Sequence, residues 1–143
     1  MLSDFQIIPF RKVFETMLAD IGNGHFMGIP SETFAKDRFE NITQPRFNHK
    51  LETPIGVAAG PHSQLSHNIV AAWLTGARYI ELKTVQTLDE LNVTKPCIDM
   101  QDEGYNCEWS QELKIQQSFN QYLDAWIMVH VLNHKLYGRT EAG

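Results

Sequence analysis

Apolar residues recur at steps of three and four in three segments of the chain, the spacing that lines one face of an α-helix. These segments are 9–20, 65–75 and 115–137, and a glycine follows each of them: Gly22, Gly76 and Gly138. Glycine favours a helix end because it adopts the left-handed conformation without a Cβ clash. We therefore predict three helices, of which the last is the longest.

Two short apolar runs have a different pattern. PIGVAA at 54–59 is bounded by Pro54 and Gly60, and RYIELKTV at 78–85 is rich in strand-forming residues. With the helix at 65–75 between them they predict a βαβ unit. Such units are almost always right-handed, with parallel strands whose carboxyl ends meet at one rim. Side chains just after 59 and 83 are therefore expected to share that rim.

The remaining segments are polar and rich in turn-forming residues. Residues 22–54 predict irregular connections with a small hairpin or turn and a short helical stretch at 31–39. Residues 86–111 predict a long, structure-poor loop, and loops of that length are usually functional or mobile. We divide the chain into an N-terminal helical and irregular extension, 1–52, and the βα units, 53–143.

Composition narrows the class of function. The chain has 143 residues, 43% hydrophobic and 20% charged, and a formal charge of −5, which disfavours nucleic acid and anionic membranes as partners. The N-terminal segment lacks the apolar core of a signal peptide, and no stretch of about 18 apolar residues predicts a membrane span. Cys97 and Cys107 show no metal-binding spacing. These features favour the cytoplasm, with both thiols reduced.

Lys83 is the first candidate for chemistry, because it ends an apolar strand at the rim where α/β barrels keep their active sites. Its ammonium could neutralise an anionic flavin ring or, if desolvated, form a Schiff base with a carbonyl substrate. The structural alternative is a lysine that leaves the sheet and pairs with Glu81 or Asp89. The residues alone leave these interpretations open.

Two further segments could contact a ligand. Ala58, Ala59 and Gly60 remove side-chain bulk at the end of the first strand, so a flat ligand could lie against the backbone there, although the residues alone favour a tight strand-to-helix turn with no ligand. Asn106, in the polar loop, could bind the imide edge of a heterocycle, or the loop could be merely solvated. His130 and His134 lack the glutamate of an HExxH motif, so we predict no metal site.

The strings TPIGVAAGPHSQLSHNIV and GARYIELKTVQTLDELNVTKPCIDMQDEGYNCEWS, with the helix that follows, resemble the N-terminal region of selenate reductase subunits of the YgfK type. The resemblance covers nearly the whole chain. It implies the α/β class and a dihydroorotate-dehydrogenase-like TIM (β/α)8 barrel, present here as a partial barrel, an N-terminal fragment with an extra N-terminal helix.

The resemblance also implies roles for individual residues. Ala58, Ala59 and Gly60 match the segment that lies against FMN in dihydroorotate dehydrogenases, and Lys83 with Thr84 matches the flavin- and substrate-contacting lysine. Lys83 is therefore also the implied catalytic residue. Asn106 falls where that family holds its pyrimidine, but the local string is YNCEW, which departs from the family's NSMG-like string and puts pyrimidine specificity in doubt.

The resemblance implies an oxidoreductase that passes electrons between a heterocyclic or oxyanion substrate and a chain of FMN, FAD, iron–sulfur clusters and NAD(P). Two barrel strands cannot close a barrel, which takes about 250 residues. We therefore expect the chain to need the remainder of its own polypeptide or other redox subunits, to be inactive alone and to bind FMN weakly or not at all. Alternatives are a non-catalytic scaffold in an electron-transfer complex and, more remotely, a Schiff-base aldolase using Lys83.

Overall fold

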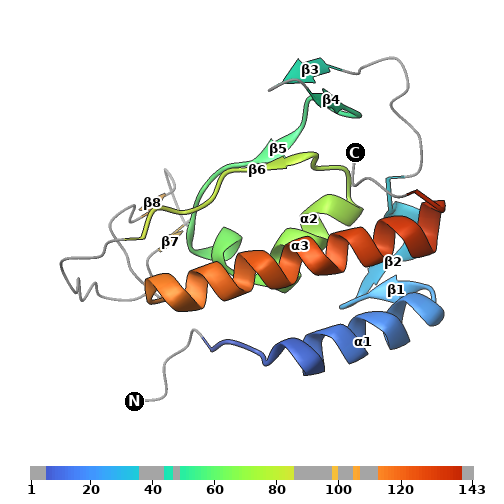
Figure 1. The fold of residues 1–143 in the computed structure, drawn as a ribbon, viewed down its shortest axis with the longest axis horizontal. Helices are drawn as coiled ribbons and strands as arrows, with labels where there is room; N and C mark the ends of the chain where they lie inside the picture. The colour runs from blue at the N-terminus through green and yellow to red at the C-terminus, as the bar shows by residue number, and fades with distance from the viewer. Residues whose placement is uncertain are drawn as a thin grey trace.

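The computed structural model describes residues 6–35, 44–46, 49–85, 98–99, 105–106 and 113–139. The described elements form stacked layers (Figure 1). A two-stranded ribbon, β5 and β6, lies over the helices α2 and α3, and α1 with the hairpin β1–β2 lies on the other side of those helices. The helices α2 and α3 are therefore packed between the strands β5 and β6 and the N-terminal extension.

The three predicted helices are confirmed. They are α1 (Phe10–Gly22), α2 (Ser66–Leu74) and α3 (Ile115–Tyr137). Gly138 follows α3 with φ 66°, and Gly76 lies just beyond α2 with φ 118°, so both positions use the conformational freedom that predicted a glycine there. Two short 3-10 turns accompany them, η1 (Ser31–Thr33) and η2 (Pro61–Gln64).

The helical stretch predicted at 31–39 is wrong where the structure describes it. Only the single turn η1 forms, and Phe34 after it is extended, with φ −63° and ψ 138°. The backbone N–H of Ala35 donates to the carbonyl of Leu74 at 2.7 Å. This contact to the end of α2 fixes the extended segment, so a tertiary hydrogen bond replaces the next helical one.

The predicted parallel pairing is confirmed. β5 (Gly56–Val57) and β6 (Tyr79–Ile80) are parallel, with Gly56 opposite Tyr79 and Val57 opposite Ile80. Both strands are much shorter than the predicted 54–59 and 78–85. Flanking backbone bonds extend the alignment, from Arg78 N–H to the Ile55 carbonyl and from Glu81 N–H to the Val57 carbonyl, each 2.9 Å.

The ring of Tyr79 explains the glycine at the paired position. A Cβ built on Gly56 would lie 2.2 Å from a ring carbon of Tyr79, so the ring covers the backbone of the neighbouring strand. Aromatic residues placed across from a strand glycine restore the packing that the missing side chain would give.

Three antiparallel pairs complete the described strands. They are β1 (His25–Phe26) with β2 (Ile29–Pro30), β3 (Gln44–Arg46) with β4 (His49–Leu51), and β7 (Ile98–Asp99) with β8 (Tyr105–Asn106). The first two confirm the hairpin predicted within 22–54. The third lies within the loop predicted at 86–111, of which only 98–99 and 105–106 are described, so the expectation for the rest of that segment stays a prediction.

The hydrophobic core joins the N-terminal extension to the βα unit. Its buried members come from α1, the segment after it, α2 and α3: Val13, Met17, Phe26, Phe34, Val70, Trp73, Leu74, Met128 and Leu132. Burying one such side chain stabilises the fold by about 1.5–3 kcal/mol. The apolar face of α1 is therefore committed to covering α2 and the C-terminal half of α3.

A set of polar contacts closes the amino end of the strands, and we call it the amino-end network: Glu52, Thr53, Trp73, Arg78 and Arg139. The side chain of Arg78 is 5% exposed, and its guanidinium donates from Nε to Glu52 Oε2 at 2.7 Å and from Nη1 to the carbonyls of Trp73 (2.9 Å) and Ala77 (3.0 Å). Arg78 also stacks over the Trp73 ring, 5.2 Å from its centroid.

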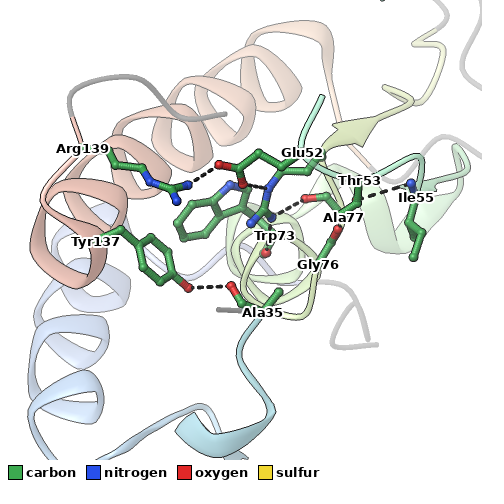
Figure 2. A network of polar contacts seen from close by, with 10 residues as sticks. Ala35, Glu52, Thr53, Ile55, Trp73, Gly76, Ala77, Tyr137 and Arg139 are labelled. Atoms are coloured by element: carbon green, nitrogen blue, oxygen red, sulfur yellow. Dashed lines mark hydrogen bonds and ion pairs between the residues drawn. The ribbon is translucent and has the colours of Figure 1, made fainter. Parts of the chain in front are cut away.

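The network ties three distant segments together (Figure 2). Arg139, after α3, pairs with the same carboxylate of Glu52. The hydroxyl of Thr53, fully buried, donates to the Gly76 carbonyl at 2.7 Å, and Tyr137 donates to the Ala35 carbonyl at 3.0 Å. The ends of α2 and α3 are thus held against the start of β5.

Candidate functional site

The segments after β5 and β6 meet at one rim, as parallel strands require. The backbone N–H of Ala59 donates to Glu81 Oε2 at 3.0 Å, and the N–H of Glu81 donates back to the Val57 carbonyl at 2.9 Å. The small-residue turn and the segment that carries Lys83 are therefore joined directly. The contact runs through Glu81, which the sequence had suggested only as a pairing partner for Lys83.

The turn Ala58 to Gly60 is shaped by its own neighbours. Ala58 is exposed, Ala59 is partly exposed and Gly60 is buried. The hydroxyl of Ser63 accepts from the Gly60 N–H and donates to the Gly60 carbonyl, both at 3.0 Å. A Cβ on Gly60 would lie 2.7 Å from the ring of His62. The turn is thus rigid, and its open surface is at Ala58.

The prediction that Lys83 ends the second strand is wrong, because β6 ends at Ile80 and Lys83 lies three residues beyond it, only 6% exposed. Its backbone carbonyl accepts from the Tyr122 hydroxyl of α3 at 3.4 Å. Burying a lysine ammonium is costly unless polar groups compensate it, so this position differs from a strand-end lysine that projects into water. The next residue, Thr84, is exposed.

Several other buried polar residues surround this end of the unit, and sequence reasoning missed them: Ser63, Gln64, Ser66, Ser118 and Gln121. Gln121 Oε1 accepts from the backbone N–H of Ser66 at 3.0 Å, which satisfies a donor at the start of α2. Within the described residues the buried hydroxyl of Ser118 has no hydrogen-bond partner.

A signal for part of this group was present in the sequence. Ser118, Gln121, Ala125 and Met128 follow one another at steps of three, four and three residues. Ser118 and Gln121 therefore lie on the same buried face of α3 as the two apolar residues. Burying a polar side chain costs free energy unless it is hydrogen-bonded, so polar residues on an apolar helical face indicate a buried polar contact. Gln64 ends the 3-10 turn η2 and Ser66 begins α2, and neither gave such a signal.

Burial also shifts the protonation of groups at this end. Burial lowers the pKa of His67 on α2 below its usual 6.5 and raises the pKa of Tyr122 above its usual 10.0. Tyr122 therefore stays a neutral donor near neutral pH. Burial also raises the pKa of Asp124, one turn further along α3 than Gln121.

Asn106 lies in β8, where its backbone pairs opposite Ile98. Its side chain lies outside the described residues, so its proposed contact with substrate stays a prediction. In the described ranges no three histidine, cysteine, aspartate or glutamate side chains could hold a metal ion together. None of the helices described is both long and apolar enough to cross a membrane.

Comparison with known proteins identifies the family. Residues 27–143 match the family model described as "Oxidoreductase YgfK, N-terminal TIM-barrel domain". The chain belongs to this family. Its fold is thus part of a TIM-barrel domain, in agreement with the parallel β5–α2–β6 unit followed by α3.

Curated relatives agree with the family model. The chain is 44% identical over 126 residues to "Putative oxidoreductase YgfK" of Escherichia coli (strain K12), and the same values hold for the protein of that name from Escherichia coli O157:H7. The match covers 87% of this chain and 12% of each relative. No solved structure matches the chain.

Proposed function

We propose that the chain contributes two strands and one flavin-facing turn to a flavin-dependent oxidoreductase barrel. Family membership supports oxidoreductase chemistry in general. The observation that supports a flavin is the convergence of the Ala58–Gly60 turn and the Lys83 segment at the carboxyl end of parallel strands, joined by the Ala59–Glu81 hydrogen bond. Active sites of TIM barrels lie at that end.

The residues of the turn suit contact with the face of a flat ring. Ala58 offers an exposed surface with little bulk. The N–H of Ala59 is already held by Glu81 and the N–H of Gly60 by Ser63, so neither amide is free to donate to a ligand in this arrangement. We therefore expect the turn to hold an isoalloxazine ring by van der Waals contact, with polar recognition coming from other residues.

Lys83 would supply the electrostatic part. An FMN, when bound, carries the hydride or electron chemistry. In our proposal the Lys83 ammonium stabilises negative charge that develops on the flavin or on the substrate, Thr84 completes the cofactor side of the rim, and Asn106 binds substrate. Glu81 is a positioning residue, because it acts by holding the Ala59 amide.

The wider electron path is also a proposal. The substrate would be a nitrogen heterocycle or an oxyanion such as selenate, and electrons would pass through iron–sulfur clusters and FAD to or from NAD(P). These groups would be carried by the remainder of a longer polypeptide or by other redox subunits. The support is that the chain spans only 12% of the relatives it matches, which leaves room for such parts.

The test uses the longer polypeptide that completes the barrel. Lys83→Met should lower FMN occupancy or turnover at least tenfold, while the folded protein keeps its circular dichroism spectrum. Lys135→Met is the matched control, because Lys135 is exposed on α3 and should change neither value. Unchanged occupancy and turnover in Lys83→Met would contradict the assignment.

One observation favours a second candidate, a barrel that only scaffolds an electron-transfer complex. The amides of the turn are satisfied internally, and the string around Asn106 departs from the substrate-binding string of dihydroorotate dehydrogenases. Flavin analysis of the purified longer protein separates the two candidates. A scaffold should carry no stoichiometric FMN in this domain, whereas the proposed enzyme should carry one.

A further inference from the structure

The helix α3 carries an exposed apolar surface along its N-terminal half. We call the residues Ile115, Phe119, Leu123 and Trp126 the α3 stripe; they are 58%, 58%, 43% and 63% exposed. Their spacing of four, four and three places them on one helical face. Four large apolar side chains gathered in this way are unusual on a free surface and mark an interaction site.

Other faces of α3 contact the hydrophobic core, the start of α2 and the segment that carries Lys83. Met128 and Leu132 belong to the core shared with α1 and α2, and Gln121 reaches the start of α2. Tyr122 faces the segment that carries Lys83. At about 100° per residue, Tyr122 lies between the α2-facing positions and the stripe, so the stripe is on the side of the helix away from α2.

The N-terminal extension does not cover the stripe. In Figure 1, α1 lies along the C-terminal half of α3, and the N-terminal half projects beyond it. The polar residues of that half, including Gln116 and Asn120, lie on the face that remains and bond to each other at 3.0 Å. The helix therefore has a polar surface suited to water and a separate apolar surface that no described element covers.

The position of the stripe fits one kind of occupant. In a barrel, each helix packs against the strands on its inner side and against one neighbouring helix on each flank. In the described part of the chain, β5 and β6 form a two-stranded sheet, so the outer edge of β6 is open to a further strand. A strand added to the free edge of β6 would bring its own helix against α3 on the side opposite α2, which is where the stripe lies.

We propose that the α3 stripe is the docking face for the next helix of the barrel, an amphipathic helix whose preceding strand pairs with the free edge of β6. The partner is the polypeptide that carries the rest of the barrel. The family is described as a TIM-barrel domain, and the match covers only 12% of its curated relatives, which leaves chain for such a segment. The assignment is independent of flavin.

The experiment co-expresses this chain with the segment that follows the matched region in the relative from Escherichia coli strain K12. Copurification measures binding, and hydroxyl-radical footprinting with mass spectrometry measures the accessibility of Phe119 and Trp126. We expect a complex in which oxidation of both side chains falls at least fivefold. Phe119→Ser with Trp126→Ser should abolish copurification and leave the helical spectrum unchanged, since both residues are exposed.

Gln116→Ser with Asn120→Ser is the matched control on the polar face, and it should bind as the unaltered chain does. Equal binding by the stripe variant, or full oxidation of Trp126 within the complex, would overturn the proposal. A dimer of this chain that depends on the stripe and persists in the presence of the added segment would also overturn it, because the occupant would then be a second copy. Sedimentation measures that outcome.

Discussion

The two ends of the β5–α2–β6 unit each bury a cation, but they surround it differently. At the amino end, Arg78 donates to a carboxylate and two carbonyls and stacks on Trp73, while Arg139 adds a second cation to Glu52. At the carboxyl end, Lys83 is 6% exposed, the Thr84 that follows it is exposed, and the carboxylate of Glu81 accepts from the Ala59 N–H.

With the proposed role of Lys83, this difference assigns stability to the amino end and chemistry to the carboxyl end. A guanidinium with fixed, planar donors suits a permanent structural lock, whereas a lysine amine changes its properties with its surroundings and suits a reacting site. The lower face of TIM barrels generally serves stability and the upper face function. We expect variants of the amino-end network to affect unfolding strongly, and variants at the carboxyl end to affect it less.

Arg78→Ala should produce the largest loss of stability. It leaves Glu52 with one cation and removes the guanidinium donor from the carbonyls of Ala77 and Trp73, of which the latter keeps the Gly76 N–H, so we expect the free energy of unfolding in urea to fall by about 3 kcal/mol. Arg11→Ala removes an exposed i, i+4 pair with Glu15 and should cost less than about 0.5 kcal/mol. Similar losses in both variants would contradict a structural lock at the amino end.

Thr53→Val tests the same end with a neutral group. The variant keeps the shape of the buried side chain but removes the hydrogen bond to the Gly76 carbonyl, and we expect a loss of about 2 kcal/mol. Thr75→Val removes an exposed hydroxyl that bonds only within its own helix and should leave the urea midpoint almost unchanged. A Thr53 variant as stable as that control would show that the bond adds nothing.

Gln121→Leu applies the comparison to the carboxyl end. The buried N–H of Ser66 loses its acceptor, but the new side chain adds apolar contact, so we expect a net loss of only about 1 kcal/mol. Gln116→Leu, on the exposed face of α3, should change the unfolding free energy by less. If Gln121→Leu cost as much as Arg78→Ala, the two ends would not differ as proposed.

The smallest expected effect is a pH dependence at His67. Burial lowers its folded pKa below 6.5, so the unfolded state binds more protons, and the free energy of unfolding should fall as pH decreases from about 6.5 toward the folded value. His67→Gln should remove that part of the slope. The check is urea unfolding between pH 5 and 7.5 with an NMR titration of His67; an unchanged slope in the variant would refute it.

Local patterns predicted the helices well, because an apolar face of period 3.6 and a following glycine are local properties. α1 and α3 follow the predicted bounds closely, and Gly138 adopts the expected positive φ. The strands were overestimated, since apolar composition extends beyond the two residues that pair in β5 and β6. Strand ends depend on which neighbours supply hydrogen bonds, and that is not a local property.

The sequence by itself determined the order of the three helices, the parallel βαβ unit and hence the meeting of the Ala58–Gly60 turn with the Lys83 segment. Only the tertiary structure decided that Glu81 holds the Ala59 amide, that Arg78 and Arg139 share Glu52, and that the α3 stripe is uncovered. The physical reason is range: periodicity and turn chemistry act between near neighbours, whereas these contacts join residues that come together only when the layers pack.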